Sequence, residues 1–161
     1  MKPCATAVVA LALSLGAAHA KWDAYVPRTL RAVIEANRSS VAENAPHFLA
    51  KDGFPTKARV VYDGKLQPIP ADRYAFLADS MAVKGHPEWA KTFTTEILCS
   101  EGEARYWIPL QGPLVPRIGK EIAPGDPLDI YVTLVGANRK GSDLDWVFAI
   151  NEFLPAPAGA K

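Results

Sequence analysis

Two stretches of the chain have the hydrophobic spacing of helices. In residues 27–45, apolar side chains recur at the 3.6-residue period of one helix face, and Pro46 marks the end of the stretch. This face consists of Leu30, Val33, Ile34 and Val41. A second helix of one to three turns is expected within residues 69–85, with Pro70 near its start and Gly85 after its end. The pattern therefore predicts a long amphipathic helix first and a shorter helix further along.

Alternating apolar and polar positions predict three hairpins. The first lies in residues 57–69, where Asp63-Gly64 separates two apolar-rich runs, a pair that favours the tight turn of a two-residue hairpin. The second lies in residues 92–111, with residues 100–103 as its loop. The third follows a turn signal in residues 124–127 and joins two alternating runs through a polar loop at residues 137–143.

The alternation in the second hairpin supports one register. A four-residue loop places eight side chains on one face in four cross-strand pairs: Cys99 with Ala104, Ile97 with Tyr106, Thr95 with Ile108, and Phe93 with Leu110. A slip by one residue would move the apolar set of one strand to the other face. The same register turns Trp107 away from the core, with Glu96, Leu98 and Arg105 as its neighbours.

These elements predict an α+β fold. An N-terminal amphipathic helix would accompany a small curled antiparallel β-sheet, or a partly open barrel, built from three hairpins. One face of the third hairpin is apolar and the other is half apolar, which indicates that another element covers part of it. Residues 21–154 are expected to form a single globular domain. Residues 155–161 have two prolines and no apolar period, and we expect a flexible tail there.

The first twenty residues have the composition of a secretory signal peptide. Lys2 precedes a small and apolar run over residues 5–18, and residues 18–20 read Ala-His-Ala, a cleavage pattern. Cleavage near Ala20 would remove Cys4, direct the chain to the periplasm or the cell exterior, and leave no transmembrane segment. A retained signal anchor is the alternative.

Charge argues against a general affinity for polyanions. The chain has 18 Lys and Arg and 17 Asp and Glu, so loss of Lys2 with the signal peptide leaves 17 of each. This balance gives no general attraction to nucleic acid or to an anionic membrane, and no nucleic-acid partner is expected. A local basic face remains on the first predicted helix, where Arg28, Arg31 and Arg38 lie with Glu35 among them. Such a face can dock phosphate groups or an acidic protein, although a solvated face with local ion pairs is commoner.

Little in the sequence points to catalysis. Cys99 is the one cysteine left after cleavage, so no internal disulfide is expected, and the hairpin register makes it a small buried hydrophobe. His86 and Glu88 are two potential metal ligands on one turn, but no third or fourth ligand follows nearby. No catalytic residue, metal ligand or cofactor is therefore assigned.

The outward face of the sheet carries the candidate binding residues. If the second and third hairpins lie side by side, a patch forms there from Trp107, Tyr131, Arg105, Glu96 and Leu98. An exposed patch of this kind would suit a sugar ring or a peptide. The alternative is that the apolar stripe of the first helix packs on this face and buries it, since an amphipathic helix must cover its apolar side.

The sequence favours a non-catalytic binding or accessory domain exported to the bacterial envelope, with an envelope protein or a glycan as its partner. One alternative is a cell-wall or glycan hydrolase with paired carboxylates, for which Glu96 and Asp145 are the candidate acids. Another is an inhibitor of a secreted enzyme, in which the proline-rich segment 109–117 enters the cleft of the partner.

Overall fold

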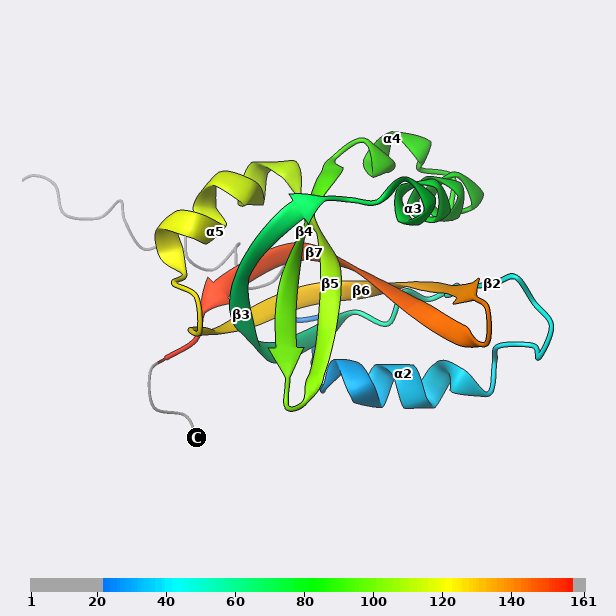
Figure 1. Cartoon of the computed structure of the whole chain (residues 1–161), viewed down its shortest axis with the longest axis horizontal. Coiled ribbons are helices and arrows are strands. Elements are labelled where there is room, and N and C mark those ends of the chain that lie inside the picture. Colours follow the sequence, from blue (N-terminus) through cyan, green and yellow to red (C-terminus); the bar gives the residue numbers. More distant parts are fainter. Residues whose placement is uncertain (1–21, 158–161) are drawn as a thin grey trace, which may run out of the picture.

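The computed structural model describes residues 22–157 and shows an α+β fold, in which a seven-stranded mixed sheet is combined with four α-helices (Figure 1). The helices are α2 (Leu30–Arg38), α3 (Ala71–Val83), α4 (Pro87–Ala90) and α5 (Val115–Glu121). The strands are β1 (Val26–Pro27), β2 (His47–Leu49), β3 (Thr56–Pro68), β4 (Phe93–Glu101), β5 (Ala104–Gln111), β6 (Pro127–Lys140) and β7 (Asp143–Pro155). The expected signal peptide, residues 1–20, lies outside the described residues. No helix between residues 22 and 157 has both the length and the apolar character needed to cross a membrane.

Five of the strands form a ring. The order along the sheet is β1-β3-β4-β5-β7-β6-β2, and an additional pairing of β3 with β6 joins the two sides. Most neighbours are antiparallel, but β1 pairs with β3, and β5 with β7, in parallel. The sheet is therefore mixed, with antiparallel pairing as expected between most strands and two parallel pairings that were not expected. The parallel pairing of β5 with β7 arises because the helix after β5 carries the chain across the ring before β6 and β7 return.

The hairpin predicted at Asp63-Gly64 is absent, and one long strand, β3, occupies the region. Its first half pairs with β6 and its second half pairs with β4, with a register shift between Tyr62 and Leu66. Gly64 has a φ of +76°, and a Cβ there would lie 2.7 Å from the Pro124 side chain. The same residues that can close a hairpin here form a bulge, which bends the strand so that it can join two neighbours of the ring.

The second predicted hairpin exists, with a tighter turn than expected. Glu101 pairs with Ala104, so the register differs by two residues from the expected one, and the alternation of faces is unchanged. Cys99 now lies opposite Tyr106, and both strands still send their apolar set inward. Phe93 is the exception, because a second register shift next to it turns its side chain to the outer face.

The third predicted hairpin is longer than expected. β6 continues to Lys140 and β7 begins at Asp143, so that two residues rather than seven connect the strands. The polar residues of the expected loop take part in pairing because β2 adds to the other edge of β6 at Gly136 to Asn138. At the other end, β7 runs through Pro155, into the segment expected to be a tail.

The inside of the ring holds the main core, and α2 covers one opening of it. Within residues 27–45 the structure has a helix over Leu30–Arg38 alone, and Val41 lies beyond its end. The apolar face of α2 packs into the same core as the inward side chains of the strands. Thr29 is the N-cap of α2, and its hydroxyl accepts a hydrogen bond from the Ala32 amide. The carboxylate of Glu101 accepts hydrogen bonds from the first two helical amides, those of Leu30 and Arg31.

A second, smaller core lies outside the ring, between α3 and the outer face of β6 and β7. Phe76 and Leu77 of α3 pack there against Val135, Val147 and Ala149. The half-apolar face of the third hairpin is thus covered by α3. The expectation that the first helix covers this face is wrong, because α2 puts its apolar stripe into the ring opening.

Candidate functional site

One arginine organises the outer face next to α3. Arg73, on the first turn of α3, has a side chain that is 11% exposed. Its Nη1 donates to Glu96 Oε2 at 2.7 Å and to the Trp107 carbonyl at 3.1 Å. Its Nη2 and Nε donate to the two carboxylate oxygens of Asp145 at 2.7 and 3.2 Å. Arg73 therefore joins β4, β5 and β7 from outside the ring.

Both carboxylates that were candidate acids for hydrolysis, Glu96 and Asp145, are hydrogen-bonded to Arg73. Glu96 is 0% exposed, and its second oxygen accepts from Gln67 Nε2 at 2.6 Å. Asp145 also lies 3.3 Å from Lys140 Nζ. Burial lowers the pKa of Arg73, but the hydrogen bonds and charges of Asp145 and Glu96 outweigh it, so the pKa is raised and the guanidinium stays charged. Glu96 is a buried structural ion-pair partner, which corrects its place in the predicted binding patch.

The predicted patch is divided by the fold. Leu98 and Trp107 are direct cross-strand partners on the outer face of β4 and β5, with Leu98 buried and Trp107 half-buried. Arg105 lies on the same face and is largely exposed. Tyr131, on β6, is separated from them by β7 and packs instead against Trp22 and Tyr25, with ring centroids 5.0 and 5.5 Å away. The expectation that Tyr131 joins the patch is wrong, because the ring places β7 between β5 and β6.

A hollow of about 390 Å³ lies beside Leu98 and Arg105. Asp63 lies at its wall, held by the hydroxyl of Ser100, which donates to Oδ1 at 2.7 Å. The other oxygen, Oδ2, is buried without a hydrogen-bond partner among the described residues, and Arg105 Nε lies 3.6 Å from it. The lining residues are Tyr62, Asp63, Lys65, Leu98, Arg105, Pro124 and Gly125.

Sequence reasoning missed the role of Asp63, because the Asp-Gly pair was interpreted as the tip of a hairpin. An aspartate at a turn usually satisfies its carboxylate locally or in solvent. The bulge instead turns Asp63 toward β4, where Ser100 binds it. No local signal distinguishes these two uses of the same dipeptide.

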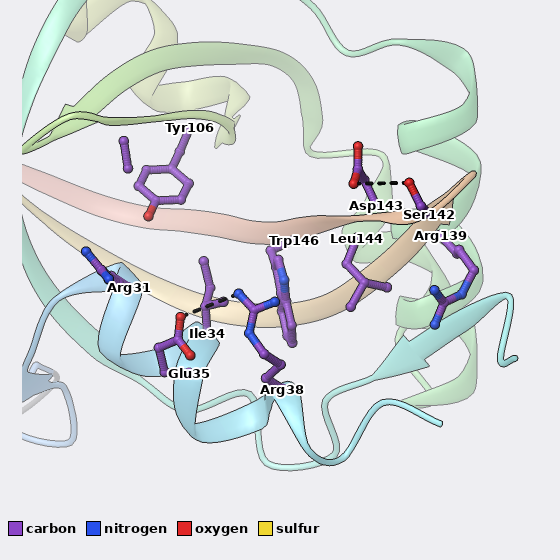
Figure 2. A pocket seen from close by; sticks show the side chains of 11 residues that line it. Arg31, Ile34, Glu35, Arg38, Tyr106, Arg139, Ser142, Asp143, Leu144 and Trp146 are labelled. Atoms are coloured by element: carbon purple, nitrogen blue, oxygen red, sulfur yellow. Dashed lines mark hydrogen bonds and ion pairs between the residues drawn. The ribbon is translucent and has the colours of Figure 1, made fainter. Parts of the chain in front are cut away.

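A larger hollow, of about 530 Å³, lies between α2 and the ends of β5 and β7. Figure 2 shows Arg38 in front of the Trp146 indole, with Glu35 beside it and Tyr106 further along the groove. Arg139 forms the opposite end and is fixed by hydrogen bonds to the carbonyls of Ala42 and Ala45. We call this hollow the α2 groove; its lining residues are Arg31, Ile34, Glu35, Arg38, Ala104, Tyr106, Arg139, Ser142, Asp143, Leu144 and Trp146.

The cysteine and the histidine considered for chemistry do not form a reactive site in the structure. Cys99 is buried in the ring, and burial raises the pKa of its thiol to about 12, so it is protonated near neutral pH. His86 lies 3.6 Å from Glu88 and stacks on Trp89 with ring centroids 4.1 Å apart. In residues 22–157 no three His, Cys, Asp or Glu side chains gather in a way that could hold a metal ion.

The proline-rich segment is not a protruding loop. Gly112–Leu114 forms a 3-10 turn and Val115–Glu121 forms α5, with Pro116 in the first turn. Leu114 and Ile118 are buried in the ring core. The expectation that this segment forms an insertion loop is therefore wrong, because its apolar side chains anchor it as a helix over one end of the ring.

Comparison with known proteins gives no relative: no family model, no curated protein and no solved structure matches this chain.

Proposed function

We propose that this chain is an exported, non-catalytic binding domain of the bacterial envelope, and that the hollow at Asp63 receives an acidic sugar of an envelope glycan. The signal-peptide pattern of residues 1–20 supports the export. The observation that supports this ligand is the buried Oδ2 of Asp63, which has an ion pair with Arg105 but accepts no hydrogen bond from the described residues, at the wall of a hollow with cationic side chains.

The chemistry of the hollow favours a ligand with both a donor and a negative charge. A buried acceptor without a donor costs about 1–3 kcal/mol, and a sugar hydroxyl could supply the missing hydrogen bond. Lys65 and Arg105 stand at the same hollow and suit a carboxylate on the sugar. Leu98 and Tyr62 add an apolar wall for the face of the ring.

The position of the hollow gives further support. Five-stranded barrels of the OB class bind oligosaccharides or oligonucleotides on the face of their second and third strands. In this ring β4 and β5 are the second and third strands along the chain, and Leu98 and Arg105 lie on their outer face. This support is an analogy of architecture, and the chemistry of the hollow carries the proposal.

The hydrolase alternative finds no support in the geometry. A general acid must reach the glycosidic oxygen, whereas Glu96 is 0% exposed and bound on both oxygens. We expect the mature chain to release no sugar from peptidoglycan. If the wild type did hydrolyse peptidoglycan and the Glu96→Gln variant did not, the hydrolase hypothesis would be supported instead.

Two sugars that differ in one carboxylate test the proposed ligand. N-acetylmuramic acid and N-acetylglucosamine share a ring, and the first adds a lactyl carboxylate. By calorimetry with residues 21–161 we expect the acidic sugar to bind at least 10-fold more tightly. Asp63→Asn should weaken this binding about 10-fold without lowering the unfolding temperature, since it removes a buried acceptor that receives no hydrogen bond and whose ion pair is to the largely exposed Arg105.

Lys91→Ala is the matched control, because Lys91 is an exposed cation at the end of α4, outside the hollow. Equal affinity for the two sugars would refute the role of Lys65 and Arg105. Unchanged affinity in Asp63→Asn would refute the role of the carboxylate.

A further inference from the structure

The ring is open along one seam. β5 and β7 are paired at a single position, Leu110 with Ile150, although β5 begins at Ala104 and β7 at Asp143, well before this pair. Pro109 precedes this pair and has no amide hydrogen to extend the ladder. Figure 1 shows the β4–β5 hairpin and the β6–β7 hairpin pointing in different directions from this place. The first halves of both strands therefore have a backbone edge that no described strand covers.

The α2 groove lies at this opening. Ala104 and Tyr106 of β5 form one side of it, and Leu144 and Trp146 of β7 form the other. α2 runs beneath, between the tips of the two hairpins (Figure 1). Arg73 crosses the same seam from the outer face, where its Nη1 binds the Trp107 carbonyl of β5 and its Nη2 binds the Asp145 carboxylate of β7. The groove is the inner side of the seam, which faces α2 and which Arg73 does not line.

Positive charge gathers around the opening. Arg31, Arg38 and Arg139 line the groove, against Glu35 and Asp143. The Arg38–Glu35 pair is 3.4 Å long and largely exposed, so an incoming carboxylate can replace it at little cost. Arg31 makes no ion pair with any of the residues in the described range 22–157, and Arg139 is held in place by two backbone carbonyls.

We infer that the α2 groove binds an extended, acidic polypeptide segment of a partner protein. Its backbone would pair with the free edge of β5 or β7, the mode by which peptides add to exposed strands. Acidic side chains on one face of the added strand would meet the arginines, and apolar side chains on the other face would meet Tyr106 and Trp146. The uncovered strand edges favour a peptide over an acidic glycan, which has no ladder of amides to offer.

Two decapeptides test this inference: acetyl-(Glu-Val)5-amide and acetyl-(Gln-Val)5-amide, each labelled with a fluorophore and followed by anisotropy. We expect the Glu peptide to bind at least 10-fold more tightly than the Gln peptide, and 0.5 M salt to remove most of the difference. The double variant Arg31→Gln, Arg38→Gln should lose at least 10-fold. Lys120→Gln, on α5 and outside the groove, should bind as the wild type does.

Two further probes distinguish a peptide ligand from a glycan ligand, and backbone pairing at the strand edge from attraction between charges. The Glu peptide methylated on alternate amides keeps its charge but cannot complete a ladder, and it should bind at least 10-fold more weakly. Equal binding by the methylated peptide, or tighter binding by an oligomannuronate of equal charge, would overturn the inference. Asp63→Asn should leave peptide binding unchanged, because Asp63 does not line the α2 groove. A negative result for the peptide site would therefore be distinct from a negative result for the proposed sugar site.

Discussion

Arg73 and Glu96 form a buried ion pair, with Nη1 and Oε2 2.7 Å apart and the Glu96 side chain wholly excluded from solvent. The pair joins the helix inserted between β3 and β4 to the ring itself. A buried charge is tolerated only when its partner is present, so each of the two side chains requires the other. Loss of either side chain alone should therefore destabilise the fold.

Substitution Arg73→Met should destabilise the fold by about 3–5 kcal/mol, because it leaves the Glu96 carboxylate buried without a counter-charge. Urea unfolding followed by circular dichroism measures this loss. Arg117→Met removes a partly exposed arginine from its pairs with Glu121 and Glu152, and it should cost about 1 kcal/mol or less. Similar losses in the two variants would contradict the structural role of Arg73.

Removal of both charges should cost less than removal of one. The double variant Arg73→Met, Glu96→Gln no longer buries an unpaired charge, so it should recover part of the stability that Arg73→Met loses. The coupling free energy between the two positions, obtained from a double-mutant cycle, should be about 1–3 kcal/mol. A value near zero would mean that the two side chains act independently.

Cys99 should make stability depend on alkaline pH. Burial raises the pKa of its thiol from the ordinary value of 9.0 to about 12, with the negative charge of Asp63 as a smaller cause. A raised folded pKa contributes stability below the unfolded pKa, and this contribution is lost as pH rises from about 9 towards 12. Urea unfolding at pH 8, 9 and 10 should show a steeper decline for the wild type than for Cys99→Ala. Parallel declines would show that the thiol titrates alike in the folded and unfolded states.

Gly64→Ala should destabilise the protein more than Gly102→Ala. Both glycines have positive φ, so each alanine carries a backbone cost of about 1–2 kcal/mol. At Gly64 the new Cβ would also lie 2.7 Å from Pro124, whereas nothing lies within 4 Å at Gly102. We expect a difference of at least about 1 kcal/mol between the two variants in chemical unfolding. Equal losses would show that the α5–β6 connection moves aside without cost.

Trp107→Ala tests how much the Trp107 side chain contributes to the free energy of unfolding. Truncation of a fully buried aromatic side chain costs about 3–5 kcal/mol, and Trp107 is half-buried, so we expect about 2 kcal/mol. Phe148→Ala, in the ring core, should reach the full range. A loss as large as that of Phe148 would assign Trp107 to the core, and a loss near zero would make it a free surface residue.

The faces of the strands could be predicted from the sequence, whereas their partners could not. Alternation placed Cys99 and Tyr106 inward and Trp107 outward, because a shift of two residues leaves faces unchanged. The turn sets the exact register, and Glu101 with Ala104 can close the hairpin as well as the longer loop can. The same limit applies to Asp63-Gly64, which favours a sharp change of direction but does not say whether a hairpin or a bulge makes it.

The candidate site depends on contacts between distant parts of the chain. Arg73 lies 23 residues from Glu96 and 72 from Asp145, and no short pattern relates them. The helix that covers the outer face could not be predicted for the same reason: α2 and α3 each have an apolar face, and only the closed ring decides which surface each face covers. Leu98, Trp107 and Arg105 could be placed together because one hairpin holds all three.

Glu101 couples two elements that are far apart in sequence. Its carboxylate accepts from the amides of Leu30 at 2.8 Å and Arg31 at 3.0 Å, so the tip of the β4–β5 hairpin holds the start of α2. The two elements should therefore open together, and their amide hydrogens should exchange with deuterium at a common rate. A partner that widens the α2 groove must tilt the hairpin with the helix, which makes hydrogen exchange at the hairpin tip a reporter of events beneath α2.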